Sequence, residues 1–125
     1  MLDKIHAQND ILAFKLSSLM VRNEVIQHNI ANVDTPGFKR KIVDFENAFA
    51  RELEKSRNNN SNINFKKASP QIRLINENFS FRLDGNNVDI DVEMAELYKN
   101  TVKYDIFINA VINNNRMINL AATGR

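Results

Sequence analysis

The last third of the chain, from residue 91 to residue 122, carries a mostly apolar stripe at spacings of alternately three and four residues. A repeat of this period is typical of a coiled-coil helix. Neither Pro nor Gly occurs in it before Gly124, so we expect one helix of about 45 Å at about 1.5 Å per residue. Such a helix needs a partner to bury its stripe. The stripe consists of Met94, Leu97, Thr101, Tyr104, Ile108, Val111, Asn115, Ile118 and Ala122.

The first third of the chain carries a matching stripe, which supplies this partner. We therefore predict a mainly α fold in which two long terminal heptad helices form a coiled-coil-like pair. Asn residues fall on both stripes, where a buried Asn sets register and partner number and lowers stability. Alternatively, an Asn-rich chain places some Asn there by chance. The first stripe consists of Ile5, Asn9, Leu12, Leu16, Leu19, Asn23, Ile26, Ile30 and Val33.

Length and composition limit the chain to one domain with a modest core, because it has only 125 residues. Its net charge of +2 is too small to indicate nucleic-acid binding. The sequence has no Cys, which excludes disulfides and thiol chemistry, and no apolar run of about 20 residues that would span a membrane. We expect no cleaved secretory signal. Composition alone would place the chain in the cytoplasm.

We divide the domain, residues 1–125, into an N-terminal helix (1–33), a middle segment (34–90) and a C-terminal helix (91–125). The middle segment begins with Pro36-Gly37, a type II turn signal. A short helix is predicted from about residue 44 to residue 54, with Asp44 capping it, and a polar loop from residue 55 to residue 62. The short helix is predicted from the spacing of Ile42, Phe45, Phe49 and Leu53.

Alternating apolar residues predict short strands in the second half of the middle segment. Asp84-Gly85 lies between two such runs and predicts a small β-hairpin. The acidic residues Asp89, Asp91 and Glu93 mark the start of the last helix, where the helix dipole favours negative charge. The predicted strand residues are Ile72, Leu74, Phe79, Phe81 and Leu83 before the turn, and Val88, Ile90 and Val92 after it.

We find no pattern for catalysis, a metal or another cofactor. The acidic run from Asp84 fails the EF-hand pattern, because Val88 and Asp89 stand at its fifth and sixth positions. His6 and His28 lie at no ligand spacing. No nucleotide-binding glycine loop or hydrolase motif is present. Basic residues are scattered among acidic ones, so we predict no binding of nucleic acid.

Two motifs resemble those of a known family. The run from Asn29 to Lys39, at the end of the first helix, is similar to a signature of bacterial flagellar rod and hook proteins. The run from Arg82 to Met94 resembles the FlgB family of proximal-rod proteins, and the two motifs occur in the expected order. The motif residues are Asn29, Ala31, Asn32, Thr35, Pro36, Gly37 and Phe38, then Asp84, Gly85, Asn86, Val88 and Asp89.

The resemblance implies a structural subunit of the basal-body rod, the drive shaft for motility. Its implied partners are copies of itself, other rod proteins, membrane-ring and rod-base adaptor proteins, and the flagellar type III export apparatus. Export by that apparatus without a cleaved signal implies a periplasmic rod, which replaces the cytoplasmic assignment. The expected assembly interface is formed by Leu12, Leu16, Leu19, Asn23, Ile26, Ile30, Met94, Leu97, Tyr104, Ile108, Val111, Asn115 and Ile118.

Two other classes stay open at this stage. A cytoplasmic helical scaffold or nucleic-acid-binding bundle would show salt-dependent retention on DNA. An enzyme would need a pocket of convergent titratable groups. For the free subunit, we expect poorly ordered terminal helices that become ordered on assembly, and a preformed antiparallel helix pair is the alternative.

Overall fold

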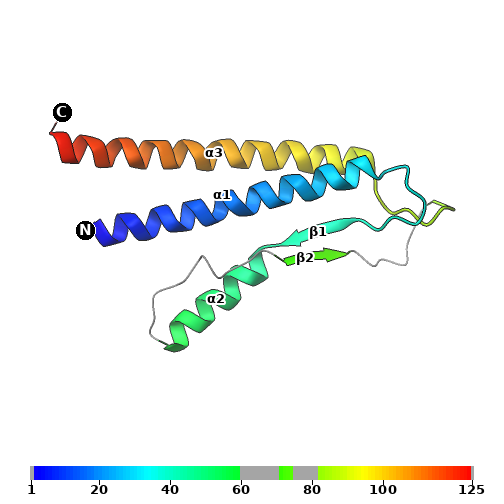
Figure 1. Ribbon diagram of the computed structural model, residues 1–125, viewed down its shortest axis with the longest axis horizontal. Helices are drawn as coiled ribbons and strands as arrows, with labels where there is room; N and C mark the ends of the chain where they lie inside the picture. Colours follow the sequence, from blue (N-terminus) through cyan, green and yellow to red (C-terminus); the bar gives the residue numbers. More distant parts are fainter. Residues whose placement is uncertain (1, 60–70, 75–81, 125) are drawn as a thin grey trace.

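The computed structural model describes residues 2–59, 71–74 and 82–124 (Figure 1). The predicted fold class is confirmed: the chain is mainly α, with two long terminal helices and a small antiparallel pair of strands between them. The elements are, in order, α1 (Leu2–Ala31), β1 (Lys41–Asp44), α2 (Glu46–Asn59), β2 (Gln71–Leu74) and α3 (Ile90–Thr123).

Helix α1 lies between two layers, with antiparallel α3 along one side and β1, β2 and α2 along the other (Figure 1). On the second side, the Phe14 ring packs against Phe45, with ring centroids 5.0 Å apart, and against Phe49 at 6.2 Å. Phe14 and Phe45 are both buried. Helix α1 therefore uses two faces, and only one of them meets its long partner.

The face that α3 turns toward α1 is polar at several positions. Its at least partly buried side chains include a heptad series, which we call the inner seam: Glu93, Leu97, Asn100, Tyr104, Phe107, Val111, Asn114 and Ile118. Alternate members coincide with the predicted stripe, and the others precede it by one residue. Asn100 Nδ2 donates to the Leu19 carbonyl at 2.9 Å, and Asn114 Nδ2 donates to Asn9 Oδ1 at 3.4 Å.

The three Asn residues expected on the seam differ in position. Asn9 contacts α3 through Asn114. Asn23 instead accepts a hydrogen bond from Gln27 on its own helix at 2.7 Å, and Asn115 is exposed. Every second position of the α3 seam is therefore shifted by one residue relative to the predicted stripe, a mean rotation of about half a residue.

The strand pair joins β1 to β2, with Lys41 opposite Leu74 and Asp44 opposite Gln71. Ile72 and Leu74 lie on a strand as predicted. Ile42 does not belong to the short helix, because it lies on β1. Asp44 caps α2 by accepting from the Asn47 N–H at 3.3 Å.

The short helix starts later and runs further than predicted. It begins at Glu46 and continues to Asn59, so the first part of the predicted polar loop is helical. The part of that loop from residue 60 onward lies outside the described residues, as do Phe79 and Phe81.

The prediction of a hairpin around Asp84-Gly85 was wrong. A turn is present, with the Gly85 N–H donating to the Arg82 carbonyl at 3.2 Å, but Leu83 lies in the turn itself. Of the residues expected on the second strand, Val88 lies in an irregular segment, and Ile90 and Val92 lie in α3. The Asn86 side chain instead holds this segment, donating to the Asn32 carbonyl and accepting from the Val88 N–H, and Asp89 caps α3 by accepting from the N–H of Asp91 at 2.9 Å and of Val92 at 3.3 Å.

Candidate functional site

The largest fully buried side chains of the described residues are polar. Glu93 is 0% exposed, and Asn29 and Asn86 are 1% exposed. They lie where the end of α1, the start of β1 and the start of α3 meet (Figure 1). We call the cluster of Asn29, Arg40, Asn86, Asn87 and Glu93 the polar joint.

Asn29 connects α1 to both of the other elements. Its Nδ2 donates to the Lys41 carbonyl at 2.8 Å, and its Oδ1 accepts from the Lys41 N–H at 3.0 Å. The side-chain amide therefore pairs with Lys41 as a neighbouring strand would, which favours an extended backbone at the start of β1. The same Nδ2 lies 3.1 Å from Glu93 Oε2.

Glu93 forms an ion pair with Arg40 through Arg40 Nε and Glu93 Oε1. A buried carboxylate is costly unless it is paired and hydrogen-bonded, and here each oxygen has a partner. Asn87 supports the pair, because its Oδ1 accepts from the Arg40 N–H at 2.7 Å and its own N–H donates to the Phe38 carbonyl at 3.4 Å. The start of α3 is thereby fixed to the strand that precedes α2.

Asn86 holds the segment that follows α1. Its Nδ2 donates to the carbonyls of Asn32 at 3.0 Å, Val33 at 2.9 Å and Thr35 at 2.9 Å. Its Oδ1 accepts from the Val88 N–H at 2.7 Å. The Asn86 side chain thus connects the segment that follows α1 to the segment that precedes α3.

Two glycines allow the two motif loops to approach each other. The predicted turn at Pro36-Gly37 is present, with the Phe38 N–H donating to the Thr35 carbonyl at 3.3 Å and Gly37 at φ 69°. Gly85 has φ 77°, and a Cβ added to it would lie 3.8 Å from Gly37 Cα. The Gly37 N–H donates to the Asp84 carbonyl at 2.8 Å. Positive φ at these positions favours Gly.

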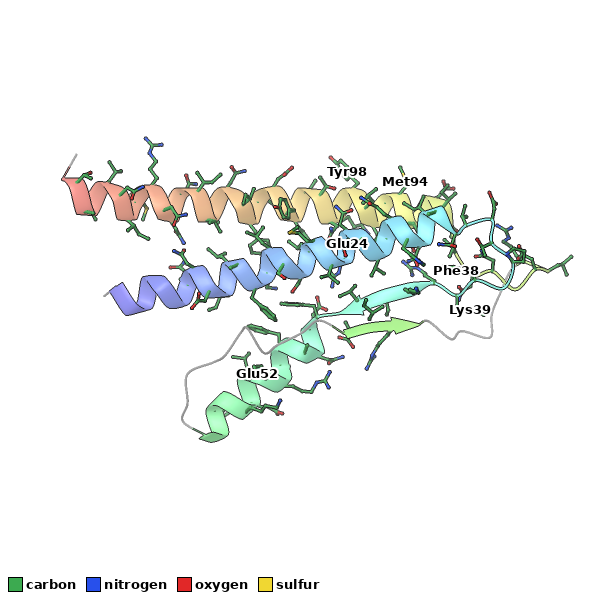
Figure 2. All side chains as sticks on the ribbon, in the orientation of Figure 1. Glu24, Phe38, Lys39, Glu52, Met94 and Tyr98 are labelled. Atoms are coloured by element: carbon green, nitrogen blue, oxygen red, sulfur yellow. The ribbon has the colours of Figure 1, made fainter. Side chains whose placement is uncertain are left out.

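Charged groups surround the exposed edge of the polar joint, at the end where Figure 2 labels Phe38 and Lys39. Lys39 Nζ donates to the Gly85 carbonyl at 2.8 Å. Arg82 pairs with Asp84 at 2.8 Å and also donates to the Val33 carbonyl at 3.0 Å. The hydrogen bond from the Asn86 N–H, with the Arg82 guanidinium, holds the pKa of Asp84 below its usual value.

The two family motifs, which lie about 50 residues apart in sequence, meet at this joint. Motif residues Asn29, Asn32, Gly37, Asp84 and Asn86 contribute to it directly through the contacts above. The other motif residues are placed as follows: Thr35, Phe38 and Gly85 through their backbones, Val88 buried, Asp89 capping α3, and Ala31 and Pro36 exposed.

Sequence reasoning missed three members of the joint, namely Arg40, Asn87 and Glu93. The available signal was the charge of Glu93, which stands one residue before Met94 at the head of a heptad stripe. We interpreted that charge as a contribution to the helix dipole, and its buried position is set by Arg40 and Asn29 instead.

The residues expected at the assembly interface are distributed over several environments. Their role in assembly stays a prediction. Leu19 and Ile26 are buried; Leu12, Leu16, Asn23, Ile30, Leu97, Tyr104, Ile108, Val111 and Ile118 are half-buried; Met94 and Asn115 are exposed.

Among residues 2–59, 71–74 and 82–124, no three His, Cys, Asp or Glu side chains gather where they would bind a metal ion. Within the same ranges, no helix has both the length and the apolar character to cross a membrane. The His28 ring packs against Phe38, with ring centroids 5.5 Å apart.

Comparison with known proteins assigns the family. No family model matches the chain. It is 38% identical over 118 residues to the flagellar basal body rod protein FlgB of Borrelia hermsii, covering 84% of this chain and 87% of that protein. It is 34% identical over 97 residues to FlgB of Bacillus subtilis (strain 168), with 74% and 75% covered, and 28% identical over 123 residues to FlgB of Escherichia coli (strain K12), with 89% of each covered. The resemblance found in the sequence is thus confirmed, and the chain belongs to the FlgB family of flagellar basal body rod proteins and is a structural component of that rod.

Proposed function

We propose that the chain serves in the rod as a non-catalytic unit whose two long helices pack against copies of itself and against other rod proteins. The polar joint is the observation that carries this proposal. It fixes the end of α1, the start of β1 and the start of α3 to one another by buried hydrogen bonds and one ion pair. A subunit that transmits torque needs such fixed geometry between its long helices.

The joint also sets the rotation of α3 about its own axis. Because Glu93 must face Arg40 and Asn29, Asn100 and Asn114, which lie 7 and 21 residues after it on the same heptad position, are directed toward α1. Large apolar residues on other sides of α3 then stay exposed, including Met94, Tyr98, Val102, Ile106 and Ile112. Exposed apolar area of this extent on one helix supports packing against neighbouring subunits.

The finer assignments form part of the same proposal. Further partners are the membrane-ring and rod-base adaptor proteins, and the chain reaches the periplasmic rod through the flagellar type III apparatus without a cleaved signal. The inner seam supports this route, because its polar residues make the helix pair easy to unfold for export. Asn100 Oδ1 is buried without a hydrogen-bond partner among the described residues, which weakens the seam further.

The proposal is tested by deleting the gene and restoring it with variants. The wild-type gene should restore rods and swimming. Leu19→Asp places a charge on a buried side chain and Ile108→Asp places one on a half-buried side chain, and a charge buried without a partner costs several kcal/mol.

Both variants should abolish swimming while the protein is still made and exported. Asn113→Asp, at an exposed position of α3, is the matched control and should swim normally. Normal swimming of the deletion strain would refute the rod assignment. Normal swimming of both Asp variants would refute packing through these helices.

A further inference from the structure

A second heptad series runs along the mostly exposed side of α3. We call it the outer stripe: Asp91, Met94, Tyr98, Thr101, Asp105, Ile108 and Ile112. All its members are exposed except Ile108, which is half-buried. Figure 2 shows Met94 and Tyr98 on the side of α3 that faces away from α1.

Tyr98 is the most prominent member of the outer stripe, because its side chain is 73% exposed. Asp91 precedes it by seven residues and Asp105 follows it by seven, so the two carboxylates lie about 10 Å from it along the helix axis in either direction. Exposed Tyr residues are frequent anchors of protein interfaces. The outer stripe is therefore an aromatic anchor with an acidic residue on each side.

A groove of matching character lies elsewhere on the same chain, between α1, α3 and the start of α2. It encloses a cavity of about 370 Å³. Leu19, Phe45 and Phe107 line its apolar part. Lys15 Nζ lies 4.8 Å from the centroid of the Phe45 ring and 5.9 Å from that of Phe107.

The rim of this groove is basic. Lys15, Arg22 and Lys103 line it together with one acidic residue, Glu46, which already pairs with Arg22 at 3.5 Å. Lys15 and Arg22 stand seven residues apart on α1, a spacing of about 10 Å along its axis. We call this cavity and its rim the basic groove.

We infer that the outer stripe of one copy docks in the basic groove of a second copy, with Tyr98 entering the cavity. The carboxylate of Asp105 then lies beside the cations of the rim, including Lys103. The opposite charges of the outer stripe and of the basic groove identify a second copy as the occupant. The inference deepens the proposed function, on which it rests, by naming the surfaces that join one copy to the next.

The geometry of this contact explains how such copies would form a rod. The outer stripe and the basic groove are different surfaces of one chain, so each copy offers both and the contact is heterologous. A heterologous contact that does not close into a ring produces an open helical array. One repeated contact would thus suffice for an axial assembly.

Charge reversal in separate copies tests the inference. Asp105→Lys places a cation on the outer stripe opposite the basic groove, and Lys103→Glu places an anion in the groove opposite the outer stripe. Either variant alone should weaken association of the purified chain by about tenfold or more, and should impair swimming of the deletion strain.

A mixture of the two variants should restore both readouts, because each remaining contact then joins opposite charges. Restoration by mixing excludes a folding defect, since a misfolded copy is not repaired by another misfolded copy. Asp10→Lys, at an exposed position of α1, makes the same charge change as Asp105→Lys and should have no effect. Failure of the mixture to recover, or unimpaired association of the single variants, would overturn the inference.

Cross-linking in isolated basal bodies gives a second measurement. Because the sequence has no native Cys, only the introduced Cys residues of this chain can form disulfides. Thr101→Cys lies on the outer stripe and Ile106→Cys lines the basic groove. Their positions on one helix are more than 7 Å apart, too far for a disulfide within a chain. After oxidation, the double variant should give a ladder of oligomers and either single variant should give monomers only.

The two proposals fail in different ways. If basal bodies that contain the double variant give no ladder, the inference is wrong and the rod assignment stands. If the wild-type gene does not restore swimming to the deletion strain, the rod assignment itself is wrong.

Discussion

Replacing Asn86 with Ala removes the side-chain amide that makes four of the hydrogen bonds of the polar joint. Three of these bonds end on backbone carbonyls, and each carbonyl keeps another donor. The other donors are the Thr35 N–H to Asn32 O at 3.1 Å, Arg82 Nη1 to Val33 O at 3.0 Å, and the Phe38 N–H to Thr35 O at 3.3 Å. Loss of the amide therefore leaves no carbonyl of the three without a partner.

The fourth bond decides the magnitude. The Val88 N–H loses its acceptor in a buried position, because Val88 is only 5% exposed. An unsatisfied buried N–H costs about 1–3 kcal/mol, and the shared carbonyl bonds add about 1 kcal/mol together. We therefore expect Asn86→Ala to lower the free energy of unfolding by about 2–4 kcal/mol.

Urea unfolding followed by far-UV circular dichroism measures this change. Asn113→Ala, at an exposed position of α3, is the control and should change the free energy of unfolding by less than about 0.5 kcal/mol. Asn86→Asp keeps the acceptor for Val88 but turns a carboxylate oxygen toward three carbonyls, so it should cost at least as much as Asn86→Ala. Wild-type stability of Asn86→Asp would refute the donor role on which this reasoning depends.

Four further predictions concern the same region and the helix pair. Glu93→Ala should lower the free energy of unfolding in urea by about 3–5 kcal/mol, because it leaves the mostly buried charge of Arg40 unpaired. Glu93→Gln should lower it less, and equal losses would contradict the role of the ion pair. Gly37→Val should cost about 1–3 kcal/mol through strain at positive φ, and Gly37→Asn clearly less, so equal losses would mean that steric contact is responsible. The lowered pKa of Asp84 stabilises the fold above pH 3.8, and this contribution is lost as pH falls through the folded-state pKa; Asp84→Asn should therefore flatten stability against pH in that acid range, and an unchanged slope would refute the linkage. Amide exchange in the dilute free chain should be fast along the parts of α1 and α3 that lie beyond the polar joint, and slow there after assembly; strong protection of those parts in the monomer would instead establish a preformed helix pair.

The sequence by itself determined the two long helices, because an uninterrupted heptad spacing with no Pro or internal Gly admits little else. It also determined the turn at Gly37 and the family, since both depend on local residues that are read in order. Strand β2 was predictable for the same reason, as Ile72 and Leu74 alternate with polar residues.

The rotation of α3 was decided only by the tertiary structure. Two heptad stripes on α3 share every second member and differ by one residue at the others, and the more apolar stripe is the one that sequence alone predicts for the face that packs on α1. The contacts of Glu93 place the inner seam on that face instead, because Arg40 and Asn29 bind the Glu93 carboxylate on the side of α3 that faces α1. The spacing of apolar residues along a helix does not reveal the hydrogen-bond partners of Glu93, which lie about 50 or more residues away in sequence.

The same reason accounts for the misplaced hairpin. The alternation of Val88, Ile90 and Val92 fits a strand locally, and Asp84-Gly85 fits a hairpin turn. Asn86 instead binds the segment after α1, and Asp89 then starts a helix. Local propensity was overridden because buried polar groups must find hydrogen-bond partners. The partners of Asn86 are backbone carbonyls in the segment that follows the C-terminal end of α1.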